Sequence, residues 1–77
     1  MNEFQMTVGS FRQVQEFVRL AAGQPFEIRV GNEWQNINGK DLMGMFSLDY
    51  SRPVTVRGEC ADQRWIDFQQ AAQALPV

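Results

Sequence analysis

The sequence contains no histidine, and it has a single cysteine, Cys60, in 77 residues. Without histidine the chain lacks the commonest general base and a usual zinc ligand. A lone cysteine cannot form an internal disulfide, so we interpret Cys60 as a small packing residue of a reduced protein. These absences argue against an enzyme and against a metal or another cofactor.

Strong charge of one sign and long apolar runs are also missing. The chain has 7 basic and 9 acidic residues, whereas nucleic-acid binding normally requires a basic stripe, because neutralised phosphates supply much of the affinity. Arg12 and Arg19 share one helical face, but two arginines do not make such a stripe. No apolar run approaches the about 20 residues of a membrane span. We therefore predict a cytoplasmic protein that binds neither nucleic acid nor a membrane.

Hydrophobic periodicity predicts seven elements in the order β-α-β-β-α-β-α. Ser10 is a favourable N-cap for the first helix, and Gly23 ends it. Trp65 lies on the apolar stripe of the last helix and is expected in the core, whereas Trp34 follows a turn and is expected to be partly exposed. In chain order, the predicted ranges are a strand at 3–8, a helix at 10–22, strands at 26–30 and 34–38, a helix at 41–47, a strand at 54–57 and a helix at 61–75.

This order predicts one α+β domain, residues 1–77, with three helices on one face of a four-stranded sheet. The other face of the sheet would then contact water. The polar residues that alternate with apolar ones along the strands suit that open face: Glu3, Gln5, Glu27, Arg29, Thr55 and Arg57.

Residues 40–48 read KDLMGMFSL, which is similar to the K-S-I-M-G-x-M-S-L segment of the HPr family, the small phosphocarriers of the bacterial sugar phosphotransferase system. The resemblance needs no gap from Ser10 to Leu48 and covers nearly the whole chain. It implies the family's open-faced β-sandwich, with a four-stranded antiparallel sheet.

The family's active-site segment, H-x-R-P, corresponds here to Ser10-Phe11-Arg12-Gln13. Ser10 therefore takes the place of the phosphorylated histidine, and Arg12 matches the family arginine. Asp41 stands where many members carry a regulatory serine. The chain most resembles divergent HPr-like proteins of clostridia and relatives, which also lack the histidine.

Ser10 and Asp41 each have a structural and a functional interpretation. Ser10 is either only an N-cap, or part of an anion site in which Arg12 and the first amides of the helix receive a partner's carboxylate or phosphate. Asp41 is either a second N-cap or a partial, permanent stand-in for phosphoserine. A serine phosphate is an ordinary ester and a poor phosphoryl donor, so Ser10 cannot replace the histidine as a carrier.

The short second helix carries four large apolar residues within five positions: Leu42, Met43, Met45 and Phe46. One turn of helix cannot bury all of them, so we expect some to reach solvent, with Met43 and Phe46 the first candidates. The alternative is that all four belong to the core. In the HPr family the corresponding surface docks protein partners, with the arginine beside it.

We therefore predict a monomeric, non-catalytic binding module that docks through Arg12, Asp41 and residues of the second helix. The resemblance implies a phosphotransferase-system protein, a transcription regulator or a metabolic enzyme as the partner. One alternative is a regulatory protein that is phosphorylated on Ser10 or Ser47. Another is a structural subunit of an oligomer.

Overall fold

The computed structural model describes residues 2–76; the predicted domain, 1–77, extends one residue further at each end. The four strands form one antiparallel sheet in the order β1-β4-β2-β3, which confirms the predicted class and order of elements. No helix among residues 2–76 is long and apolar enough to cross a membrane. The elements are β1 (Asn2–Met6), α1 (Phe11–Ala22), β2 (Ile28–Gly31), β3 (Asn36–Asn38), α2 (Leu42–Phe46), β4 (Val54–Gly58) and α3 (Gln63–Gln73).

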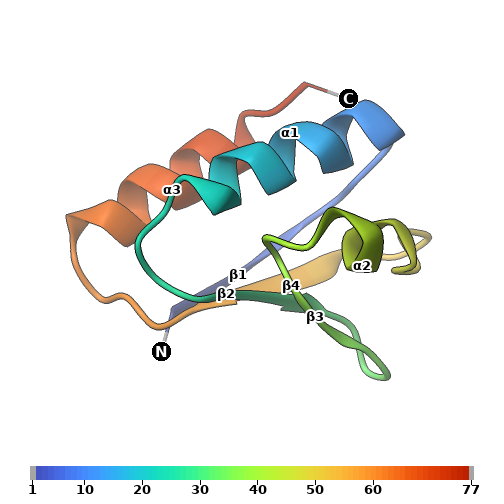
Figure 1. The fold of residues 1–77 in the computed structure, drawn as a ribbon, viewed down its shortest axis with the longest axis horizontal. Helices are drawn as coiled ribbons and strands as arrows, with labels where there is room; N and C mark the ends of the chain where they lie inside the picture. The colour runs from blue at the N-terminus through green and yellow to red at the C-terminus, as the bar shows by residue number, and fades with distance from the viewer. Residues whose placement is uncertain (1, 77) are drawn as a thin grey trace.

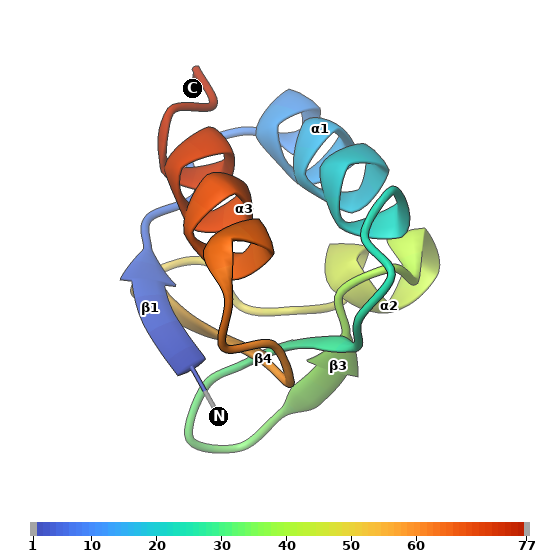
Figure 2. The same ribbon diagram turned by 90° about the vertical axis from the view of Figure 1, so that its left-hand side faces the viewer.

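The helices lie on one side of the sheet (Figures 1 and 2). The long helices α1 and α3 run side by side, and α2 packs between α1 and β3. The opposite face is polar, as predicted: Arg57 lies directly between Glu3 and Arg29 in the strand register and forms a salt bridge with Glu3 at 2.9 Å. Arg29 instead donates to the side-chain oxygen of Asn36, so the two neighbouring arginines have separate partners.

The core between the layers is built around aromatic rings. Trp65 and Phe68 of α3 face the sheet, and their ring centroids are 5.7 Å apart. Phe4 of β1 and Phe26 contact both of these rings, and Phe17 of α1 contacts Phe68. The core position of Trp65 is thus confirmed.

A close contact joins α3 to β4. A Cβ atom added to Gly58 would lie 2.1 Å from the Trp65 ring, so the indole occupies the space that any other side chain would need. Cys60 lies two residues after this glycine and is buried, as predicted for a packing residue. Its thiol lies 3.1 Å from the Asp62 carboxylate.

The predicted ends of the strands were wrong where side chains bind backbone groups. The first strand ends at Met6, before Val8, because the Thr7 carbonyl and the Gly9 amide hydrogen-bond to the side chain of Gln13. β3 begins at Asn36, because the Asn32 carboxamide accepts from the amides of residues 34 and 35 and holds them in a turn.

Two further boundaries differ from the prediction. The last helix begins at Gln63, because Asp62 is its N-cap and accepts the Arg64 amide at 3.0 Å. Ala61, which falls inside the predicted range of that helix, lies before the observed helix and is exposed. β2 begins at Ile28, and Phe26 reaches the aromatic core from the preceding loop.

Replacing Gly58 by alanine should destabilise the protein, because the new methyl group would force Trp65 out of its place. We expect Gly58→Ala to lower the free energy of unfolding by about 1–3 kcal/mol, measured by urea denaturation. Gly23→Ala is the matched control: Gly23 is helical (φ −78°), and its added Cβ would lie 3.5 Å from the nearest atom. The control should be neutral or stabilising by up to about 1 kcal/mol. Equal stability of the two variants would contradict the packing described here.

Candidate protein-docking site

The N-terminus of α1 is closed by two of its own side chains. The Ser10 hydroxyl accepts the Gln13 amide at 3.1 Å, which confirms Ser10 as the N-cap. The Gln13 carboxamide turns back, accepts the Gly9 amide at 2.8 Å and donates to the Thr7 carbonyl at 3.2 Å. This is a variant of the capping box, in which the third helical residue returns a hydrogen bond to the backbone before the helix. Gln13 was missed, although the S-x-x-Q spacing is a recognisable signal.

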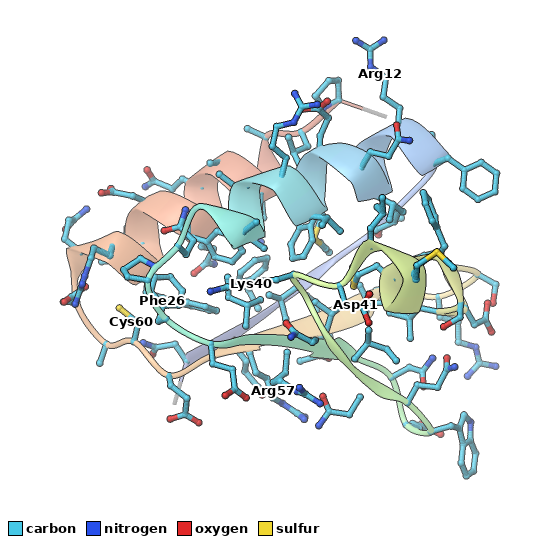
Figure 3. All side chains as sticks on the ribbon, viewed as in Figure 1. Arg12, Phe26, Lys40, Asp41, Arg57 and Cys60 are labelled. Carbon is cyan, nitrogen blue, oxygen red and sulfur yellow. The ribbon has the colours of Figure 1, made fainter. Side chains whose placement is uncertain are left out.

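The cap weakens the interpretation of Ser10 as part of an anion site. Ser10 itself occupies the Gln13 amide, one of the groups that would have bound the anion. Arg12 is exposed and projects from α1 away from the sheet (Figure 3). Asp41 lies at the start of α2, well separated from Arg12 in the same view. The structure therefore does not bring Arg12 and Asp41 together in one site.

Asp41 holds the N-cap position of α2, as predicted, but its carboxylate makes no capping hydrogen bond. The residue is exposed, so the carboxylate is available to a partner. The glycine of the motif, Gly44, has a packing role here. A Cβ on Gly44 would lie 2.8 Å from the Ile37 side chain and 3.0 Å from an Asp41 carboxylate oxygen, so glycine allows α2 to approach β3 closely.

The apolar residues of α2 divide between the surface and the core. Met43 is 80% exposed, Leu42 38% and Phe46 36%, so the expected exposure of Met43 and Phe46 is confirmed. Met45 is only 2% exposed. Its place in a docking surface is therefore corrected: Met45 faces inward and anchors α2 to the core. The alternative that all four residues are core is also wrong.

Phe11 is an exposed aromatic residue that the hydrophobic pattern of the sequence does not single out. It is the first residue of α1 and is 75% exposed. Its ring meets that of Phe46 edge to face, with centroids 5.6 Å apart, so α1 and α2 share one apolar surface. We call Phe11, Leu42, Met43 and Phe46 the α1–α2 patch. Phe11 lies outside the motif of the second helix, and its contact depends on how α1 and α2 pack.

The short helix α2 is held at both ends. The Lys40 ammonium group donates to the Gln24 carbonyl at 2.8 Å, which ties the start of α2 to the loop after α1. At the other end, the Tyr50 hydroxyl donates to the Met45 carbonyl, and the exposed Ser47 hydroxyl donates to the Gly44 carbonyl at 2.7 Å. These bonds satisfy carbonyls that a helix leaves free at its C-terminus. The backbone beneath the α1–α2 patch is therefore fixed.

Removing the Gln13 side chain should destabilise the start of α1. Gln13→Ala deprives the Gly9 amide and the Thr7 carbonyl of their partners, so we expect a loss of about 2 kcal/mol in urea denaturation. Gln15→Ala is the control, since Gln15 is exposed on the same helix; its effect should stay within about 0.5 kcal/mol. Equal effects of the two substitutions would show that the Gln13 hydrogen bonds contribute little to stability.

Burial raises the pKa of Tyr50 to about 12. This value lies above the ordinary pKa of about 10, so the folded protein favours the neutral tyrosine. The resulting contribution to the free energy of unfolding is fully present below about pH 10 and is lost as the pH rises through 12. Tyr50 is the single tyrosine of the chain, so absorbance of tyrosinate reports it directly. We expect a midpoint near 12 for the folded protein and near 10 in concentrated urea. A midpoint near 10 in both would contradict the burial of this hydroxyl.

The fold of this chain is similar to that of solved structures, although its sequence matches no known family. No family model matches the sequence, and no curated protein matches it. Two of the solved structures that share the architecture are HPr crystal structures. HPr-C-His from Thermoanaerobacter tengcongensis superposes with a TM-score of 0.72 at 21% identity, over 100% of each chain. The phosphocarrier protein HPr from Bacillus anthracis str. Ames gives a TM-score of 0.72 at 20% identity, over 95% of this chain and 93% of its own. The chain thus has an HPr-like fold, an open-faced sandwich of four antiparallel strands and three helices, as predicted.

Proposed function

We propose that this chain is a non-catalytic HPr-like binding module, a monomer of the cytoplasm that docks a protein partner through the α1–α2 patch. The observation that carries the proposal is the exposure of four large apolar side chains from two helices in one surface. Contiguous apolar surface of this kind on a small domain marks an interaction site more often than scattered exposed residues do.

The energetics of the patch suit protein docking. Full burial of a Phe or Met side chain that is exposed in the free protein contributes about 1.5–3 kcal/mol. Phe11 and Met43 are each at least three-quarters exposed, so a partner that covers both gains most of this free energy twice. Because both ends of α2 are held by hydrogen bonds, little backbone freedom has to be lost on binding.

A carrier function is not part of this proposal. The chain has no histidine to form a phosphoimidazole, and the resemblance to HPr aligns Ser10 with the family's phosphorylated residue. A phosphoserine ester at Ser10 would not pass its phosphoryl group onward. The Ser10 hydroxyl instead caps α1, and Gln13, in place of the family's proline, completes that cap. These features support a descendant of the carrier fold that retains docking without phosphoryl transfer.

The partner is a phosphotransferase-system protein or a regulator of sugar catabolism. This part of the proposal follows from the likeness to HPr structures, one of them described as a phosphocarrier. Asp41 supports a regulatory partner, because its carboxylate is exposed beside the patch and is not used as a cap. It would supply part of the charge that a phosphoserine supplies in HPr.

The test is an NMR titration of the ¹⁵N-labelled protein with enzyme I, the HPr kinase and the sugar-responsive regulator of its host. We expect saturable shifts at Phe11 and along α2 with one of them. Met43→Ala and Phe11→Ala should each weaken that complex about 10-fold, equivalent to about 1.4 kcal/mol. Ile66→Ala is the matched control, because Ile66 is an exposed apolar residue of α3 outside the patch, and it should bind as the parent does.

Three outcomes would count against parts of this proposal. Absence of shifts with every protein at high concentration would exclude the partner class. Shifts confined to residues outside α1 and α2 would exclude the patch as the docking surface. Binding of Asp41→Ala and Asp41→Ser with unchanged affinity would remove the role of Asp41 as a phosphoserine stand-in, while leaving the patch itself in place.

A further inference from the structure

The face of the sheet that carries no helix contains an open hollow of about 690 Å³. Its floor is one row of residues across three strands, because Thr55 of β4 pairs with Gln5 of β1 on one side and with Gly31 of β2 on the other. The turn between β2 and β3, with Trp34, and the loop before β4, with Arg52, form the rim. The hollow thus lies on the opposite face of the sheet from the helices and the α1–α2 patch.

Gly31, at the floor of the hollow, allows the returning chain of the hairpin to approach β2 closely. A Cβ on Gly31 would lie 2.2 Å from the Gln35 carbonyl oxygen, which belongs to the returning chain. No larger residue fits at this position without moving the turn. The floor therefore has no side chain at the point where β2 meets the turn, in register with Thr55 of β4.

Trp34 presents a flat apolar surface at the rim. It is 88% exposed, more than any other large apolar residue described. Its backbone is nevertheless fixed, because the Asn32 side chain accepts the Trp34 amide at 2.8 Å and the Gln35 amide at 2.9 Å. A rigid turn thus holds an indole that contributes almost nothing to the core, and whose face is free to stack against a ligand.

The charges around the hollow balance. Glu33 and Asp49 oppose Arg52 and Arg57 among its lining residues, and Arg57 is already paired with Glu3. Figure 3 shows Arg57 on the side of the sheet away from the helices. Hydrogen bonds from Ser51 hold the pKa of Asp49 below its ordinary value, which favours the ionised carboxylate. With as many carboxylates as guanidinium groups around it, the hollow offers no net attraction to a phosphate or another anion, which disfavours nucleotides and nucleic acid here.

The remaining lining groups exclude a purely apolar ligand. Such a ligand would remove water from the Gln5 carboxamide and the Thr55 hydroxyl without replacing their hydrogen bonds. A sugar ring has the complementary chemistry: one face of C–H groups for an indole, and neutral hydroxyls around its edge for amide, hydroxyl and guanidinium groups. We propose that the hollow binds a neutral saccharide, stacked on Trp34 and hydrogen-bonded by Gln5, Thr55 and Arg52.

The test follows the two indole N–H signals of the ¹⁵N-labelled protein during titration with maltotriose, cellotriose and triacetylchitotriose, each to about 20 mM, a range suited to millimolar dissociation constants. At least one sugar should shift the Trp34 signal saturably, together with the amides of Gln5 and Thr55, and leave Trp65 unmoved. Trp34→Ala should weaken this binding at least about 10-fold. Met43→Ala, in the α1–α2 patch, should bind the sugar as the parent does.

The proposal is overturned if none of the three sugars produces a saturable shift. It is also overturned if Trp34→Ala binds as tightly as the parent, or if inorganic phosphate or adenosine monophosphate shifts Trp34 more strongly than any sugar. The Trp65 signal and the backbone spectrum show that each variant is folded, since Trp34 is not part of the core. Failure here leaves the docking proposal untouched, because the two sites share no residue.

Discussion

The contact between the Trp65 ring and the bare backbone of Gly58 holds the two layers of this protein together. It places α3 against β4, a central strand, and the same ring meets Phe4 of the neighbouring strand and Phe26 of the loop before β2. Phe68 also contacts Phe17 of α1, and α1 packs against α2. Aromatic contacts of this kind add to the burial of large rings, so the close approach at Gly58 lies at one end of a chain of packing that joins the sheet, α3 and α1.

The candidate docking surface exists because local hydrogen bonds hold both helices that form it. The capping box of Gln13 fixes the first turn of α1, from which Phe11 projects, and Lys40 and Tyr50 fix the two ends of α2. Met45 turns inward and anchors the helix, which leaves Met43 outward two residues earlier. The patch is therefore a rigid apolar surface on a polar molecule, and the sheet face behind it is independent of it.

The architecture could be predicted from the sequence because each element has a clear hydrophobic period. Trp65 was identified as core from helical spacing, and the polar face of the sheet from the alternation of polar and apolar residues along the strands. The ends of β1 and β3 could not be predicted, since they depend on where the carboxamides of Gln13 and Asn32 find backbone partners.

The docking surface was predictable only in part. Met43 was identified from the crowding of apolar residues in a short helix, whereas the inward direction of Met45 depends on how α2 sits over β3. Phe11 and Phe46 belong to segments 35 residues apart (46 − 11), and only the packing of α1 on α2 brings their rings together. The hollow beside Trp34 needs three strands in register before its floor exists.

The hydrogen bond from the Gly9 amide to the buried side chain of Gln13 links hydrogen exchange at Gly9 to motion at the start of α1. Gly9 is exposed and belongs to a loop, where amide protons normally exchange with solvent water in seconds or less, yet its N–H is bound by a carboxamide that the helix holds in place. Exchange at Gly9 therefore requires the Gln13 side chain to release this amide, as it does when the first turn of α1 opens. This amide reports how often the helix end frays, and hence how long Phe11 stays in its place beside Phe46.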